Sequence, residues 1–326
     1  MKAAILRAFG GPQALVIDAV EKPRPGPGEV LIRVEAAGIN FTDTGQRAGS
    51  LGPMPLPLVM GGEVAGTVEV VGANLRDVAV GMRVAVPLFA HGRMGGYAEY
   101  VLAPAAALVP LPDSVRAADA VALMVQGMTA LRIARRFPMK DKRIFIHAAG
   151  GGVGSLLVQL ARHQGAAKIL AGASQVAKLD GLGDVVAVDY GKSGDYGQGG
   201  WMDAVKADGG ADIIFDSAGG TVTAASLSLL APGGQLVLYG LPSLSSFVMT
   251  GGEAMALVMA NQNVSGFSIM PQITPDAVKA ALVELFGLVQ AGALRPRLAT
   301  YRLDEAAKAH ADIEGRRTVG KVVLTL

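Results

Sequence analysis

A glycine-rich turn at residues 147–162 is the first part of this sequence whose residue types suggest chemistry. The stretch reads HAAGGGVGSLLVQLAR and follows the apolar run IFI; its frame is Ala149-x-Gly151-x-x-Gly154, with Ala149 in the first glycine position. Such spacing between a strand and a helix lets the backbone approach a pyrophosphate, which the helix N-terminus then binds. We therefore expect a dinucleotide to bind at Gly151, Gly152, Val153 and Gly154. The alternative is a turn between packed elements that binds no ligand.

The next expected strand, residues 167–174, indicates which dinucleotide. A site for NAD usually places Asp or Glu at the end of this strand, where it binds the ribose 2′-hydroxyl. Here the strand AKILAGAS ends in Ser174, Lys178 follows, and the first carboxylate is Asp180. A hydroxyl and an ammonium suit a 2′-phosphate, which favours NADP. The alternative is that Ser174 caps a helix and Lys178 is a solvated surface residue.

The elements around this turn change character along the chain. Residues 1–110 contain short strands such as EVLIRVEAAG, separated by turns such as PRPGPGE, which predicts a β-rich domain. After a helix at 117–137, entered through Asp113 or Ser114, strands and helices alternate up to a strand at 263–269. This alternation is typical of an α/β fold with a doubly wound parallel sheet. A helix at 275–292 and a final strand, helix and strand complete the pattern.

Composition and charge exclude several classes of function. The chain has 29 basic and 27 acidic residues, a net charge of +2, and no cysteine. This balance predicts no broad surface for nucleic acid or an anionic membrane, and the lack of cysteine excludes a thiol nucleophile and a thiolate zinc site. Residues 1–10 do not resemble a signal peptide. We expect a cytoplasmic protein that binds neither nucleic acid nor membrane.

Several motifs occur together, and in one order. They are AAGINFTDTGQRAG (36–49), VMGGEVAGTVEVVG (59–72), GGYAEYVLAP (95–104), the glycine turn, and RRTVGKVVL (316–324). With them the chain resembles the zinc-free quinone oxidoreductase (zeta-crystallin-like) branch of the medium-chain dehydrogenase/reductase superfamily. The resemblance implies a GroES-like catalytic domain at 1–117, a Rossmann NADP-binding domain at 118–264, and a segment at 265–326 that returns to the catalytic domain. It also implies an interdomain cleft and a homodimer or homotetramer.

The resemblance also implies that no zinc is bound. Zinc-dependent relatives have a catalytic Cys in a G-x-C turn and a His in a G-H-E turn, and the matching positions here are Asn40 and Gly62. The four histidines (His91, His147, His163 and His310) show no ligand spacing. Of these, we expect His147, at a strand end, to be a core or turn residue.

Without a metal, a donor must stabilise the negative charge that hydride addition builds on a carbonyl oxygen. Asn40 is the candidate catalytic residue, because its amide can donate and because it matches the lost metal position. Asp43, the second candidate, could orient Asn40 or bind the nicotinamide ribose. The alternative is that residues 40–43 form a turn whose side chains bond to their own backbone.

The family pattern selects further cofactor-binding residues. Gln126 and Thr129 match positions near the nicotinamide ribose and carboxamide. Gly240, Leu241, Phe267 and Ser268 match positions beside the nicotinamide. For the 2′-phosphate the pattern selects Ser174, Lys178, Tyr190 and Arg316, with Arg317 as the adjacent alternative to Arg316.

We therefore expect an NADPH-dependent, zinc-independent reductase of quinones or α,β-unsaturated carbonyl compounds, acting by hydride or one-electron transfer. The loop TGQRAGSLGPMPLP (44–57) lacks the tyrosines that quinone reductases of this branch often carry there. Two alternatives stay open. One is an enoyl-CoA or enoyl-thioester reductase, and the other is a non-catalytic, crystallin-like protein that binds NADPH.

Overall fold

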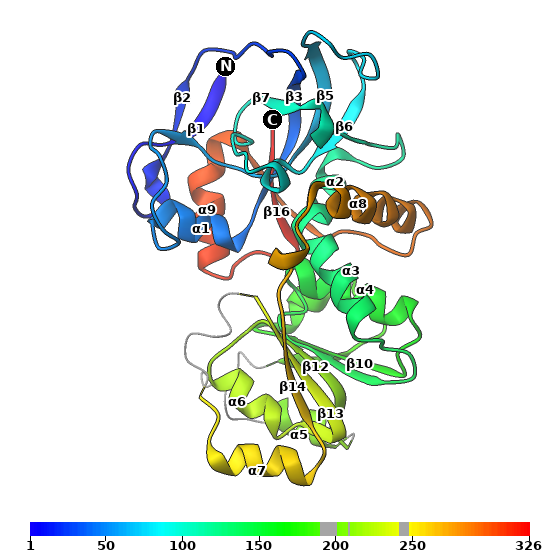
Figure 1. Cartoon of the computed structure of the whole chain (residues 1–326). Coiled ribbons are helices and arrows are strands. Elements are labelled where there is room, and N and C mark those ends of the chain that lie inside the picture. The colour runs from blue at the N-terminus through cyan, green and yellow to red at the C-terminus, as the bar shows by residue number, and fades with distance from the viewer. Residues whose placement is uncertain (190–200, 208, 241–247) are drawn as a thin grey trace. The chain divides into compact units, whose positions relative to one another are not determined.

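The computed structural model describes residues 1–189, 201–207, 209–240 and 248–326, and it divides into two compact units (Figure 1). The first unit comprises Met1–Met128 and Gln272–Leu326, and the second comprises Thr129–Pro271. The boundaries expected from the sequence, at 117 and 264, lie earlier than these divisions. Helix α2 (Ala117–Ala122) contacts strands of the first unit, and β14 (Asn263–Phe267) pairs within the sheet of the second. Because of these contacts, both boundaries between the units lie later in the chain than the expected positions.

The first unit is built on a seven-stranded sheet and a three-stranded sheet. In the larger sheet the order is β15-β16-β3-β5-β6-β8, with β7 paired to β3. Its strands are β3 (Glu29–Ile39), β5 (Val64–Val71), β6 (Arg83–Val86), β7 (Tyr100–Pro104), β8 (Val109–Pro110), β15 (Leu298–Arg302) and β16 (Lys321–Thr325). The smaller sheet consists of β1 (Lys2–Leu6), β2 (Leu15–Ala19) and β4 (Leu58–Val59). Because β16 pairs antiparallel with β3, the end of the chain completes the larger sheet.

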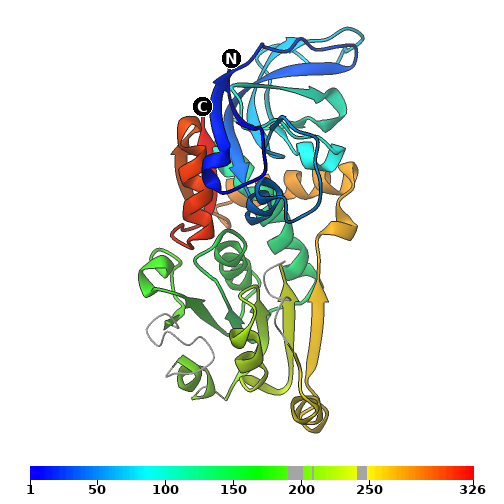
Figure 2. The ribbon, with the colours of Figure 1, turned by 90° about the vertical axis from the view of Figure 1, so that its left-hand side faces the viewer.

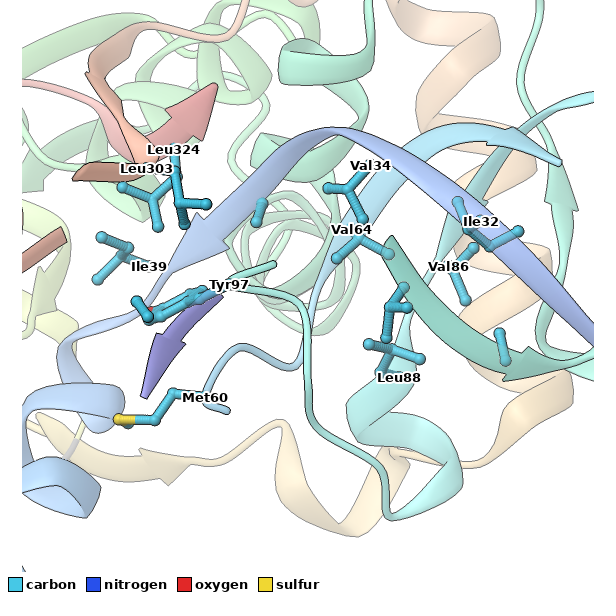
Figure 3. Packing of buried hydrophobic residues seen from close by; sticks show 14 of the residues in the cluster. Ile32, Val34, Ile39, Met60, Val64, Val86, Leu88, Tyr97, Leu303 and Leu324 are labelled. Carbon is cyan, nitrogen blue, oxygen red and sulfur yellow. The ribbon is translucent and has the colours of Figure 1, made fainter. Parts of the chain in front are cut away.

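Strand β3 carries much of the core of this unit. Its residues are buried except at Glu29, Arg33 and Glu35, so both faces of the strand are largely covered. Figure 3 shows Ile32, Val34 and Ile39 of this strand within the buried cluster. The other labelled members are Met60, Val64, Val86, Leu88, Tyr97, Leu303 and Leu324. The helices of this unit are α1 (Phe41–Ala48), α2, α8 (Pro275–Gln290) and α9 (Ala306–Glu314).

In the second unit, the described residues form a six-stranded parallel sheet with the order β11-β10-β9-β12-β13-β14. Its other strands are β9 (Arg143–Ile146), β10 (Lys168–Ala173), β11 (Val186–Asp189), β12 (Ala211–Asp216) and β13 (Leu230–Tyr239). Its helices are α3 (Met128–Arg136), α4 (Gly152–His163), α5 (Trp201–Lys206), α6 (Thr221–Leu227) and α7 (Gly251–Met259). Numbered within the unit, this order is 3-2-1-4-5-6, that of a dinucleotide-binding fold. The expected doubly wound parallel sheet is thus confirmed, and Figure 2 shows β14 at its edge.

Residues 117–136 form one helical stretch with a change of winding in its middle. Between α2 and α3, residues Leu123–Gly127 form a π-helical turn. The stretch starts at Ala117 with Arg116 in the N-cap position, so the expectation of Asp113 or Ser114 as cap is wrong. Among the described residues it is the one helix long and apolar enough to cross a membrane by length and composition. Since 72% of that window is buried inside the structure, the stretch has the burial of a core helix.

Candidate active site

Asn40 lies where β3 ends and α1 begins, as the N-cap residue of α1. Its backbone N–H donates to Asp43 Oδ2 over 2.9 Å, and the Asp43 N–H donates to the Asn40 carbonyl over 3.0 Å. The two residues have the arrangement of a capping box, in which the Asn40 side chain faces the Asp43 N–H without forming a cap hydrogen bond to it. Asp43 therefore orients the backbone of Asn40. The alternative of a self-capping turn describes Asp43 but not the Asn40 amide.

The side-chain oxygen of Asn40 accepts two hydrogen bonds from distant parts of the chain. Gln126 Nε2 and Lys321 Nζ each lie 2.8 Å from Asn40 Oδ1. Lys321 Nζ also lies 2.7 Å from Glu63 Oε2, and the other carboxylate oxygen of Glu63 accepts the Val125 N–H over 2.9 Å. Asn40 Nδ2 makes no hydrogen bond within the described residues. The amide is thus anchored through its oxygen, and its donor group remains available.

Asp43 is buried and belongs to a second set of polar contacts. Its Oδ2 also accepts the Tyr97 hydroxyl over 2.9 Å, and Tyr97 lies against His310, with 3.4 Å between the hydroxyl oxygen and Nε2. Burial raises the pKa of Asp43 to about 6, against the lowering effects of the Asn40 N–H and Lys321. Burial lowers the pKa of His310 to about 3, so its ring is neutral at pH 7. At neutral pH the ionised Asp43 carboxylate therefore has neutral donors and the Lys321 ammonium nearby.

The glycine turn of the second unit follows β9 and opens α4, as its sequence predicts. Gly151 is the N-cap residue, so the N–H groups of Gly152, Val153 and Gly154 lie in the first turn, where a helix has no internal partners for them. A Cβ at Gly154 would lie 2.8 Å from Ala149 Cα, which only a glycine avoids. This geometry fits the pyrophosphate of a dinucleotide.

Ser174 and Lys178 lie together just after β10. Lys178 Nζ donates to Ser174 Oγ over 3.1 Å, and the short 3-10 helix Val176–Leu179 places the lysine one turn after the serine. A Cβ at Gly150 would lie 2.9 Å from Lys178 Cβ, so the glycine turn packs against this segment. A hydroxyl and an ammonium thus lie beside the turn, and both groups could bind a ribose 2′-phosphate.

The other expected cofactor residues are distributed over both units. Gln126 Oε1 is buried and has no hydrogen-bond partner within the described residues, so it could accept a bond from a ligand. Thr129 lies at the start of α3 and is 9% exposed. Gly240 follows β13 and has a φ of 89°. Phe267 is the last residue of β14, and Ser268, the next residue, is exposed. Tyr190 and Leu241 lie outside the described residues.

Arg316 and Arg317 differ in their surroundings. Arg317 donates to Asp312 over 2.8 Å and to the Ala311 carbonyl over 2.9 Å. Arg316 is exposed and has a left-handed backbone, with a φ of 53°. The Arg317 guanidinium is thus held by Asp312 and Ala311, and the choice of Arg316 for the 2′-phosphate stays a prediction.

Tyr97 and Lys321 contact the candidate catalytic pair, and Glu63 contacts Lys321; none of the three had a role assigned from the sequence. Lys321 has the clearest signal, because it opens the apolar run VVL of a strand that is buried on both sides. A charged residue in such a position needs a buried partner. The sequence does not reveal which residue that partner is.

Two of the four histidines, His147 and His310, are buried side chains packed in the protein interior. His147 is fully buried, and its Nε2 lies 2.8 Å from Ser226 Oγ, which fits the expected core residue. Within the part of the chain that the structure describes, no three His, Asp or Glu side chains form a set that could hold a metal ion.

The buried Asp43 predicts a distinctive pH dependence of stability. Its folded pKa of about 6 exceeds the unfolded value of 3.8, so the folded protein binds this proton more tightly. Its contribution to the free energy of unfolding therefore falls as the pH rises from about 4 through 6. The Asp43→Asn variant lacks this loss, so the melting temperature of the wild type minus that of the variant should fall between pH 4.5 and 8. A difference that stays constant with pH would contradict the assignment, and Asp276→Asn, at an exposed position, is the control.

Comparisons with known proteins agree with this geometry. Residues 26–113 match the family model described as alcohol dehydrogenase GroES-like domain, and residues 182–324 match the one described as zinc-binding dehydrogenase. The chain is 34% identical to a quinone oxidoreductase of Pseudomonas aeruginosa (97% of each chain) and 33% identical to a 2-haloacrylate reductase of a Burkholderia species (99% and 98%). A mycobacterial protein solved in complex with NADPH matches with a TM-score of 0.83 and 32% identity over all of both chains. The chain belongs to the medium-chain dehydrogenase/reductase superfamily, in its quinone oxidoreductase branch.

Proposed function

We propose that this protein is an NADPH-dependent, zinc-independent reductase of quinones or α,β-unsaturated carbonyl compounds. The observation that carries the proposal is the Asn40 amide, whose oxygen is held by Gln126 and Lys321 and whose nitrogen has no partner within the described residues. The names of the two relatives support both substrate classes, since one is a quinone oxidoreductase and the other reduces a 2-haloacrylate. The mycobacterial complex supports NADPH as the cofactor.

The residues of the second unit fit NADPH. The α4 N-terminus would bind the pyrophosphate, and Ser174 and Lys178 would bind the 2′-phosphate, together with Arg316 and Tyr190 from the family pattern. Gln126 Oε1, a buried acceptor, would accept a hydrogen bond from the cofactor. Thr129, which follows it in the sequence, would also contact the cofactor. Gly240, Leu241, Phe267 and Ser268 keep their proposed positions beside the nicotinamide.

The mechanism follows from the charge that develops during reduction. When bound, NADPH would supply the reducing equivalents, as a hydride or, for a quinone, as single electrons. Negative charge would then develop on the acceptor oxygen until a proton from solvent completes the reduction. Asn40 Nδ2 donates to that oxygen and stabilises the charge, in the role that zinc has in the metal-dependent relatives. Asp43 and its bond to the Asn40 N–H hold the backbone that carries this donor. Loss of one such donor typically costs about 10²- to 10³-fold in kcat.

The assay that tests this function follows NADPH oxidation against four acceptors: an ortho-quinone, a small enone, 2-chloroacrylate and crotonyl-CoA, each also with NADH. We expect turnover of the quinone or of the unsaturated carbonyl compounds, with a preference for NADPH. Turnover of crotonyl-CoA alone would identify an enoyl-thioester reductase instead. Tight NADPH binding without any turnover would contradict the proposal and favour a binding protein.

Lys178 provides the sharpest test of cofactor choice. Loss of a charge-assisted hydrogen bond costs about 1.5–3 kcal/mol, which corresponds to a rise of about tenfold or more in the dissociation constant. The Lys178→Ala variant should therefore bind NADPH at least about tenfold more weakly and NADH almost unchanged, as measured by nicotinamide fluorescence. Lys206→Ala, an exposed lysine of α5, is the matched control. Equal weakening toward both cofactors would refute the 2′-phosphate assignment.

We also propose that the protein self-associates, as a homodimer or homotetramer, through the edge of the second unit. The edge strand β14 has exposed residues, and the helix before it, α7, exposes Met255 (61%), Val258 (70%) and Met259 (76%). An open strand edge beside exposed apolar side chains is suited to bind a second copy.

We also propose that the protein is cytoplasmic and that, apart from its own copies, it binds only small molecules.

Sedimentation velocity tests the proposed association. The wild type should sediment as a dimer or tetramer, and the Val258→Glu/Met259→Glu variant should sediment as a smaller species, because two charges would be buried in the interface. Val283→Glu on α8, where the replaced side chain is 57% exposed, should behave like the wild type. A monomeric wild type would contradict this part of the proposal.

A further inference from the structure

The Glu63–Lys321 ion pair is more deeply buried than a pair that serves stability alone needs to be. The exposed fractions of the two side chains are 0% and 1%, and the atoms that pair are 2.7 Å apart. Burial of such a pair carries a desolvation penalty that its attraction often does not exceed, and apolar residues of similar volume can replace it without loss of stability. The burial of this pair therefore suggests a role beyond stability, in the other group that the Lys321 ammonium contacts.

The chemistry of a lysine ammonium determines which atom of Asn40 faces it. An ammonium has only donors, so the atom 2.8 Å from Lys321 Nζ must be the amide oxygen. Gln126 must then also present its donor, Nε2, to that oxygen, which leaves Gln126 Oε1 facing away. One cation thus sets the orientation of two amides. Without it, each amide could rotate by half a turn and exchange donor for acceptor.

The strands place these groups by register. Val322 of β16 pairs with Ile39 of β3, so the next position along each strand brings Lys321 beside Asn40. On the other side of β3, the Gly38 N–H donates to the Glu63 carbonyl over 3.0 Å. Glu63 reaches Lys321 across Gly38, where a Cβ would collide with the Glu63 carboxylate and lie 2.9 Å from Lys321 Cε. Gly38 therefore leaves the space that the ion pair occupies.

We propose that Lys321, held by Glu63, is a positioning residue that orients Asn40 so that Nδ2 faces the acceptor oxygen of the substrate. This inference rests on the proposed function, because it assigns Lys321 an effect only through Asn40. It also explains why a buried charge lies at the start of β16. An apolar side chain there would leave the Asn40 amide free to present its oxygen, which would repel the developing negative charge.

A double-mutant cycle on kcat tests the proposal in the full-length protein. The charge-balanced variant Glu63→Gln/Lys321→Met removes both charges together, so that neither is left buried alone. We expect kcat for the acceptor of the wild type to fall about tenfold or more when NADPH is saturating. In the Asn40→Ala background the same double substitution should change kcat by less than about twofold, because the orienting effect has no target left.

Two further variants separate positioning from general stability. Arg47→Met/Glu314→Gln removes another pair of the same unit, in which Arg47 is 2% exposed, and should not show coupling to Asn40. Gly38→Ala keeps every charge and displaces the ion pair sterically, so it should lower kcat in the wild type and not in the Asn40→Ala background. If Glu63→Gln/Lys321→Met does not fold, the Gly38→Ala variant still tests whether the ion pair acts through Asn40.

The outcomes distinguish the two proposals. A normal kcat in Asn40→Ala would refute Asn40 as the donor, and the role of Lys321 with it. A low kcat in Asn40→Ala together with a normal kcat in the ion-pair variant would overturn the positioning role alone. Equal losses from the ion-pair variant in both backgrounds would assign the pair to stability and would also overturn the proposal.

Discussion

The site of the first unit depends on the balance of three ionisable side chains in the protein interior. Asp43 and Glu63 are carboxylates, and Lys321 is the cation that lies close to both. One ammonium compensates one carboxylate, and the second, Asp43, has a pKa raised to about 6 as a result of its burial. Such a cluster is costly to assemble unless each group finds its partner. Strands β3 and β16 and the residue before β5 must therefore meet in register for this unit to fold.

This constraint ties the C-terminal strand of the chain to the candidate catalytic residue. Lys321 lies 281 residues after Asn40 and 258 after Glu63, and it reaches both through the pairing of β16 with β3. The Glu63 carboxylate also accepts the Val125 N–H in the π-helical turn that carries Gln126. Turns of this type are frequent at functional sites, because they change the direction of a side chain within a continuous helix. In the second unit, the candidate anion site is formed by backbone N–H groups at the α4 N-terminus and not by buried charged side chains.

Sequence patterns predicted the fold and the local parts of the site. The glycine turn is a local motif, so the places of Gly151 and Gly154 follow from the sequence alone. Ser174 and Lys178 were likewise predicted to follow the next strand, but their mutual hydrogen bond was not predicted. The role of Gly38 could not be read in the same way. Its neighbours Glu63 and Lys321 come from distant strands, and only the register of the sheet reveals that a Cβ there would collide with them. The helix start at Ala117 was predicted correctly, but its cap was not, because Asp113 and Ser114 are good cap residues locally whereas Arg116 holds the N-cap position.

The orientation of the Asn40 amide is the central claim, and neutron diffraction from a perdeuterated crystal measures it directly. Deuterium and nitrogen positions distinguish Nδ2 from Oδ1 without reference to neighbouring groups. We expect three deuterons on Lys321 Nζ, one directed at Asn40 Oδ1 and one at Glu63 Oε2, with the two Nδ2 deuterons of Asn40 directed away from Lys321. Deuterons of Asn40 directed at a neutral Lys321 amine would contradict it.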